Sequence, residues 1–198
     1  LWVITQEGLS RYDGYQLIRF VHDPRKPNSI NSVNVRVIIE DNNNRLWVAT
    51  DGGGLNLFNS ANHTFTSWQS SNVLNDSPMS NKIRSMCLDQ GGAIWLVYTN
   101  GNFSRFAPVN MFFEHFNTRD LLPALNTDAA VTSIEEDANS IWLATDRNCL
   151  LRLDETNQQL TRLYKGTNTA LFSDRLLQVF IDEQQRLWLT SYDAGVSV

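Results

Sequence analysis

The residue types that most often carry chemistry are scattered along this chain. Histidine occurs at His22, His63 and His115, and cysteine at Cys87 and Cys149. No His-x-His or Cys-x-x-Cys spacing is present, whereas a zinc site needs three or four ligands that meet at one point. The sequence therefore predicts no metal site, no cofactor and no catalytic residue in this segment.

Two arginines are candidates for binding an anion. Arg36 and Arg84 occupy the same position in two similar apolar runs. If these runs form neighbouring strands, the two guanidinium groups could bind an anion such as the carboxylate or sulfate of a saccharide. An ion pair with a neighbouring strand is the alternative. We keep both arginines as candidate ligand-binding residues.

Two polar stretches are similar to loops that bind ions. Residues 41–45 begin like a calcium loop but lack the glycine and the glutamate that such a loop needs further on. Residues 51–54 contain three glycines that could offer backbone N–H groups to an anion. A phosphate loop, however, opens a helix, and this stretch joins two expected strands. We therefore interpret both stretches as turns.

Five tryptophans recur in nearly the same phrase, each after Leu or Ile and before a short apolar stretch. They are Trp2, Trp47, Trp95, Trp142 and Trp188. A period of about 45–48 residues indicates one supersecondary unit that must stack on its neighbours to bury its apolar face. A tryptophan repeated at one strand position is expected to pack between sheets and not to stack on ligands.

Ahead of each internal tryptophan stands an apolar run that ends in an aspartate. These aspartates are Asp41, Asp89, Asp137 and Asp182. A polar turn follows each of them, which indicates a hairpin, and an aspartate at such a position can bond the backbone two residues on. The short runs alternate with period two and no segment has a sustained helical pattern, so we predict an all-β chain.

The repeat predicts a β-propeller of four-stranded antiparallel blades, with residues 1–198 forming a single segment of it. The expected blades are residues 1–20 (partial), 33–68, 82–116, 130–164 and 175–198 (partial). Because the first and last blades are incomplete, we expect a window of a larger, seven-bladed propeller. The loops at residues 21–34, 69–81, 117–129 and 165–174 differ between repeats and are the expected recognition surface.

Charge and hydropathy exclude several classes of protein. The net charge is −5 and the pI is near 5.1, whereas a nucleic-acid surface needs clustered lysine and arginine. The arginines at 11, 105 and 152 share one strand position and are interpreted as a solvated face. No apolar run approaches the ~18 residues of a membrane span. The redox state of Cys87 and Cys149 stays open, with a disulfide as one alternative.

These phrases resemble the repeat of the two-component regulator propeller (Reg_prop) family. The pattern Val-x-x-Ile-x-x-Asp, a polar turn and then Leu-Trp-Val-Ala-Thr is matched best at residues 35–68, and residues 1–20 fit it as well. The stretch Phe-Val-His-Asp-Pro from Phe20 to Pro24 is similar to the loop of that family. Tyr98, Asn102 and Cys149 depart from the pattern.

The resemblance implies a bacterial sensor. In that family the propeller is the periplasmic input part of a membrane receptor, followed by one transmembrane helix and a histidine kinase, a hybrid kinase or a diguanylate cyclase. It implies an effector, in some members an oligosaccharide, and a homodimer. The segment itself would be no enzyme and would meet the membrane only through a part of the chain outside these residues.

Two other classes of function stay open. A soluble propeller lyase or hydrolase, similar to streptogramin lyase, would need clustered histidine and acidic residues with a divalent metal, and the scattered histidines count against it. A protein-interaction scaffold would use the same loop face as a sensor, so the sequence does not distinguish these two functions.

Overall fold

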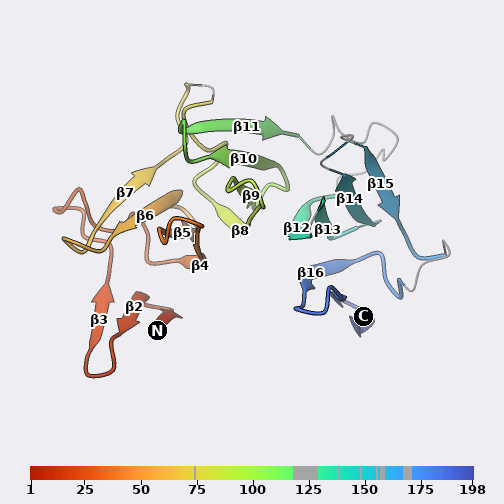
Figure 1. Cartoon of the computed structure of the whole chain (residues 1–198), viewed down its shortest axis with the longest axis horizontal. Helices are drawn as coiled ribbons and strands as arrows, with labels where there is room; N and C mark the ends of the chain where they lie inside the picture. The colour runs from red at the N-terminus through yellow and green to blue at the C-terminus, as the bar shows by residue number, and fades with distance from the viewer. Residues whose placement is uncertain are drawn as a thin grey trace.

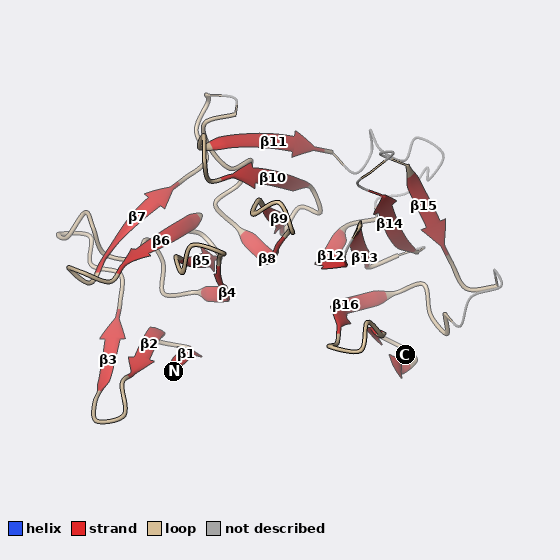
Figure 2. Ribbon diagram, viewed as in Figure 1, coloured by secondary structure: helices blue, strands red, loops and turns tan. Residues whose placement is uncertain are grey.

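The computed structural model describes residues 1–73, 75–117, 129–137, 139–147, 149–154, 156, 159–166 and 171–198. Every regular element in these ranges is a β-strand, and none of the described residues lies in a helix. Figure 2 shows strands joined only by loops. The prediction of an all-β chain is therefore confirmed.

Five antiparallel sheets follow one another along the chain, each made of consecutive strands. The first contains β1 (Trp2–Thr5), β2 (Gly8–Tyr12) and β3 (Leu17–Phe20). The second contains β4 (Val35–Glu40), β5 (Leu46–Thr50), β6 (Leu55–Asn59) and β7 (Thr64–Trp68). The third contains β8 (Ile83–Leu88), β9 (Ile94–Tyr98), β10 (Phe103–Ala107) and β11 (Phe112–Phe116).

The fourth sheet contains β12 (Val131–Asp137), β13 (Ser140–Thr145), β14 (Leu150–Asp154) and β15 (Leu160–Leu163). The fifth contains β16 (Leu176–Ile181), β17 (Leu187–Ser191) and β18 (Gly195–Ser197). Figure 1 shows the sheets side by side around an arc, with β4, β8, β12 and β16 on its inner side and β7, β11 and β15 on its outer side. This is the arrangement of a β-propeller.

The core lies between the sheets and not in one centre. A cluster between the second and third sheets contains Trp47 and Leu96, and similar clusters fill the other three interfaces. The second strand of a sheet is covered on both faces, and every residue of β5 and β9 is buried. This double burial explains why the tryptophan phrases are almost continuously apolar.

An aspartate and a tryptophan are joined in the same way in four sheets, an arrangement that we call the Asp–Trp clasp. The indole Nε1 donates to the Oδ2 of the aspartate at the end of the innermost strand. The donor–acceptor distances are 2.8 Å for Trp47 and Asp41, 3.1 Å for Trp95 and Asp89, 2.6 Å for Trp142 and Asp137, and 2.8 Å for Trp188 and Asp182.

The other carboxylate oxygen of each clasp holds the hairpin turn. Oδ1 of Asp89 accepts from the backbone N–H of Ala93 at 2.7 Å, and Oδ1 of Asp182 accepts from those of Gln184 and Arg186 at 3.0 and 2.9 Å. The hydrogen bond from Trp188, together with those from Arg186, lowers the pKa of Asp182 to about 2. The expectation that these aspartates bond the turn backbone is confirmed.

An arginine completes three of the four clasps, and it comes from one of two positions. Arg45 and Arg186 stand two residues before their tryptophans and each donates to the clasp aspartate at 2.7 Å. In the third sheet that position is alanine, and Arg105, the cross-strand partner of Trp95, donates to Asp89 at 3.1 Å. The second sheet has Leu57 at the cross-strand position.

Arginines also stack on the tryptophans of the clasps. The guanidinium carbon lies 5.9 Å from the ring centroid of Trp2 for Arg11, 5.4 Å from Trp47 for Arg45, 5.5 Å from Trp142 for Arg152, and 5.4 Å from Trp188 for Arg186. The interpretation of the arginines at 11, 105 and 152 as a solvated face agrees with the exposure of Arg152. The structure adds that Arg11 and Arg152 lie over tryptophans and that Arg105 binds a clasp aspartate. In the first sheet no described residue supplies the aspartate, and Nε of Arg11 is buried without a hydrogen-bond partner.

Removing one clasp tests how much it contributes to the free energy of unfolding. The Asp89 side chain is 2% exposed, and Asp89→Ala would leave the Trp95 indole N–H and the Arg105 guanidinium without their acceptor. We expect a loss of about 2–4 kcal/mol in the free energy of unfolding, measured by urea denaturation. The matched control is Asp76→Ala, an exposed carboxylate that should change stability by less than ~0.5 kcal/mol. Equal effects of the two substitutions would contradict a structural role of the clasp.

Candidate functional site

The innermost strands share an irregularity at one position. The register of each with its neighbour shifts by one residue, between Val35 and Val37 on β4, Ile83 and Ser85 on β8, Val131 and Ser133 on β12, and Leu176 and Gln178 on β16. The extra residues are Arg36, Arg84, Thr132 and Leu177. Since a β-bulge leaves its extra residue out of the ladder and redirects its side chain, both candidate arginines occupy bulges of adjacent sheets.

Arg36 has a partner on its own sheet. Its Nη2 lies 2.8 Å from Oδ2 of Asp51, the residue that follows β5, and its side chain is 53% exposed. The alternative considered for this arginine, an ion pair with a neighbouring strand, is thus present. Such a half-exposed pair contributes little to stability and leaves the guanidinium accessible to another anion.

Arg84 differs from Arg36. Its side chain is half-buried, and no residue in the described ranges forms a hydrogen bond or an ion pair with its guanidinium. The turn after β5 packs against the start of β8. There the backbone of Asp51 forms an isolated antiparallel β-bridge with that of Lys82, and the N–H groups of Gly52 and Gly54 donate to Asn81 O at 2.8 and 2.9 Å. We call Arg36, Asp51, Lys82 and Arg84 the inner basic site.

The other two bulges do not continue this site. Thr132 is buried and its Oγ1 donates to Ala144 O at 3.2 Å and to Leu176 O at 3.1 Å, so it joins the fourth sheet to the fifth. Leu177 carries no charge. The basic character of the inner strands is therefore confined to the second and third sheets.

Two of the three glycines at residues 52–54 serve packing. A Cβ on Gly53 would lie 2.7 Å from the backbone of Asn31 and Ser32, and a Cβ on Gly54 would lie 2.2 Å from Trp68 O. Gly54 also has a positive φ of 73°. The interpretation of this stretch as a turn agrees with these contacts. Residues 41–45 are likewise a turn, because the Asp41 oxygens are taken up by Asn43, Arg45 and Trp47.

The loop at residues 21–34, one of the expected recognition loops, is closed by its own side chains. Nδ1 of His22 lies 3.0 Å from Ile30 O, and Ser29 Oγ accepts from Asp23 N and donates to Asp23 O, both at 3.0 Å. In the next loop, Ser71 and Ser77 form a similar pair at 3.1 Å. Most of the loop at residues 117–129 and part of the loop at residues 165–174 lie outside the described residues.

The histidines and cysteines do not gather at one place. His22 lies in a loop, His63 contacts Nη2 of Arg11 at 3.2 Å, and His115 lies 2.8 Å from Ser104 Oγ. Within the described ranges, no three His, Cys, Asp or Glu side chains form a group that could hold a metal ion.

Both cysteines are buried in the cluster between the third and fourth sheets and are not joined by a disulfide. Burial raises the pKa of the Cys149 thiol. No described helix is long and apolar enough to cross a membrane.

Residues 29–52 match the family described as Two component regulator propeller, Reg_prop. This stretch contains the first bulge arginine and the Asp41–Trp47 clasp, and it ends at the first glycine of the glycine turn. Residues 29–52 are therefore similar to a two-component regulator propeller repeat. The resemblance drawn from the sequence is confirmed there. No curated protein matches the chain.

Solved structures share the fold of this chain. The extracellular domain of BT3049 from B. thetaiotaomicron, described as part of a hybrid two component system, superposes with a TM-score of 0.81 at 17% identity over 98% of this chain and 26% of that one. The extracellular domain of BT4673 gives 0.75 at 18% identity over 98% of this chain and 25% of that one. YCF48 bound to D1 peptide gives 0.65 at 11% identity over 98% and 59%.

These likenesses establish a β-propeller fold. The chain spans about a quarter of the length of the two extracellular domains that it matches. Sequence reasoning identified the two arginines but missed the bulges that present them. It also missed the arginine of the clasp, although the exchange between position 45 and position 105 is visible in the sequence.

Glu135 on β12 gives a further electrostatic feature of the inner strands. It stands where β4 has Ile39 and β8 has Cys87, in a column that is otherwise apolar. Burial, and then the charge of Glu136, raises the pKa of Glu135 from 4.5 to about 7.

This shift predicts a pH dependence of stability. The folded carboxyl keeps its proton to a higher pH than the unfolded one, so Glu135 lowers stability as the pH rises from 4.5 to about 7. Glu135→Gln removes that loss. We expect the variant to be more stable than the parent at pH 8 and similar at pH 4, measured by urea denaturation. The control is Glu40→Gln, an exposed carboxylate on β4. Parallel curves for Glu135→Gln and the parent would contradict the buried carboxyl.

Proposed function

We propose that this propeller segment is the ligand-sensing part of an extracytoplasmic, periplasmic receptor in bacterial signal transduction. The support is the Reg_prop repeat at residues 29–52 and a fold shared over 98% of the chain with extracellular domains of two-component proteins. In this proposal the segment does no catalysis. The output, a histidine kinase or a diguanylate cyclase, lies in another part of the protein and beyond a membrane segment.

The observation that carries the proposal is the pair of bulge arginines on β4 and β8. The inner basic site holds three cations, Arg36, Lys82 and Arg84, and one carboxylate, Asp51. Arg84 has no protein partner among the described residues, although it is half-buried. A planar guanidinium in that state favours a carboxylate or a sulfate, which it can bind with two hydrogen bonds.

We propose an effector that bears such a group, in the first place an acidic oligosaccharide. Arg84 would bind the anion and Arg36 would leave Asp51 to join it. An effector can signal only by binding two arrangements of the receptor with different affinity. The proposal therefore includes a homodimer, in which the effector changes the relative positions of the two subunits. It also includes a larger propeller of seven blades.

The test uses a panel of acidic and neutral oligosaccharides and the thermal unfolding of the purified protein. An effector that binds the native state raises the midpoint, and the midpoint continues to rise with the logarithm of the effector concentration above Kd. We expect acidic members alone to do so, and Arg36→Ala with Arg84→Ala to weaken that binding about 10-fold or more.

Arg147→Ala is the control, because it removes an exposed arginine that belongs to neither the inner basic site nor the cavity between the first two sheets. It should leave the affinity for the acidic oligosaccharide unchanged. Unchanged affinity in the double variant would remove the inner basic site from the proposal. Stabilisation by the neutral oligosaccharides alone would contradict the requirement for an anionic group on the effector.

A further inference from the structure

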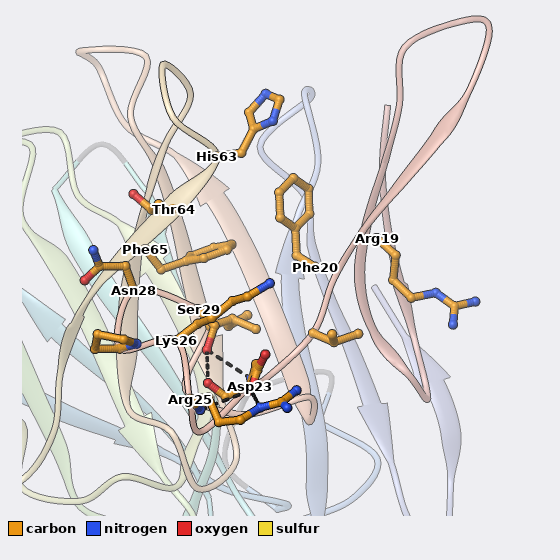
Figure 3. Close-up of a pocket in the computed structure, with 13 residues that line it drawn as sticks. Arg19, Phe20, Asp23, Arg25, Lys26, Asn28, Ser29, His63, Thr64 and Phe65 are labelled. Atoms are coloured by element: carbon orange, nitrogen blue, oxygen red, sulfur yellow. Dashed lines mark hydrogen bonds and ion pairs between the residues drawn. The ribbon is translucent and has the colours of Figure 1, made fainter.

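A cavity of about 480 Å³ lies between the first and second sheets, away from the inner basic site (Figure 3). Its walls are the end of β3, the loop at residues 21–30 and the start of β7. Small-molecule sites have volumes of about 300–1,000 Å³, so this cavity is of the right size for an organic ligand.

The cavity is preformed. The loop that makes one wall is held closed by His22, Asp23 and Ser29, as described above. It is also fixed to the second sheet, because Asn28 O accepts from the N–H of Phe65 at 2.8 Å. A ligand therefore does not have to order this loop in order to bind, which removes a large part of the usual entropic cost.

One positive charge in the cavity has no fixed counter-ion. Asp23 is the only acidic residue that lines it, and its Oδ1 lies 3.2 Å from Nε of Arg25. Arg19 is paired with Glu7 at 2.6 Å. Lys26 forms no ion pair with any described residue, and Figure 3 shows its ammonium extended between Phe20 and Phe65. The electrostatics of the cavity therefore favour an anion.

Part of the remaining wall is apolar. Phe20 and Phe65 form an edge-to-face pair with ring centroids 5.7 Å apart, and Ile30 is fully buried beside them. An inorganic anion would fill little of this volume and would gain nothing from the aromatic wall. A ring that carries the anionic group would contact both the ammonium and the phenylalanines.

We propose that this cavity binds a small organic anion, an apolar ring with a single carboxylate. The carboxylate pairs with Lys26 and the ring packs against Phe20 and Phe65. The site is separate from the inner basic site, so each proposal can fail without the other.

The test is a titration of the purified protein with benzoate, followed by NMR or calorimetry. We expect saturable binding of benzoate. Benzamide, which has the ring without the charge, and acetate, which has the charge without the ring, should each bind at least about tenfold more weakly.

Lys26→Gln should weaken benzoate binding at least about tenfold. Lys165→Gln is the matched control, since it removes the same charge from an exposed position outside both sites, and it should leave benzoate affinity unchanged. Circular dichroism of both variants confirms that they are folded.

Several results would overturn the proposal. An absence of saturable benzoate binding would do so, as would equal losses in the two lysine variants, which would reflect the overall charge of the protein. Binding of acetate or benzamide as tight as that of benzoate would remove the requirement for a ring with a carboxylate.

Discussion

The structure depends on one hydrogen bond, from the indole N–H of a tryptophan to an aspartate six residues or fewer before it. A propeller sheet is covered on both faces, so a tryptophan in its second strand must bury a polar N–H together with a large apolar surface. The clasp aspartate accepts that N–H and also holds the hairpin turn with its other oxygen. One side chain thus satisfies the tryptophan and joins the innermost strand to the next.

The arginine of the clasp shows that the interaction matters more than the position that supplies it. Arg45 reaches Asp41 from just before its tryptophan, whereas Arg105 reaches Asp89 from the neighbouring strand. Both place a guanidinium against the same carboxylate. A buried aspartate without a cation would carry an uncompensated charge, so the third sheet, which lacks the first arginine, uses the second.

The sequence was sufficient to predict the architecture because the period of its tryptophan phrases reflects how the sheets pack on one another. Trp47 and Trp95 recur in one phrase, and burial on both faces is what made that phrase apolar. The clasps could be anticipated only as aspartate turns, since a hydrogen bond to an indole leaves no mark on spacing. The bulges at Arg36 and Arg84 were not predictable for a related reason. An inserted residue inside a continuous apolar run does not alter the run, and register is a property of two paired strands.

The cavity beside Lys26 was missed for yet another reason. Its walls come from β3, a loop and β7, which belong to different repeats, and the period aligns equivalent positions and not touching ones. The fold likewise contains two kinds of residue with different roles. Residues in the ladder, such as Trp95 and Asp89, are fixed by packing and hardly free to vary. Residues that the ladder leaves out, at bulges and in loops, can change charge from one sheet to the next, as Arg84 and Thr132 do. Specificity in such a scaffold is therefore expected where the ladder is interrupted.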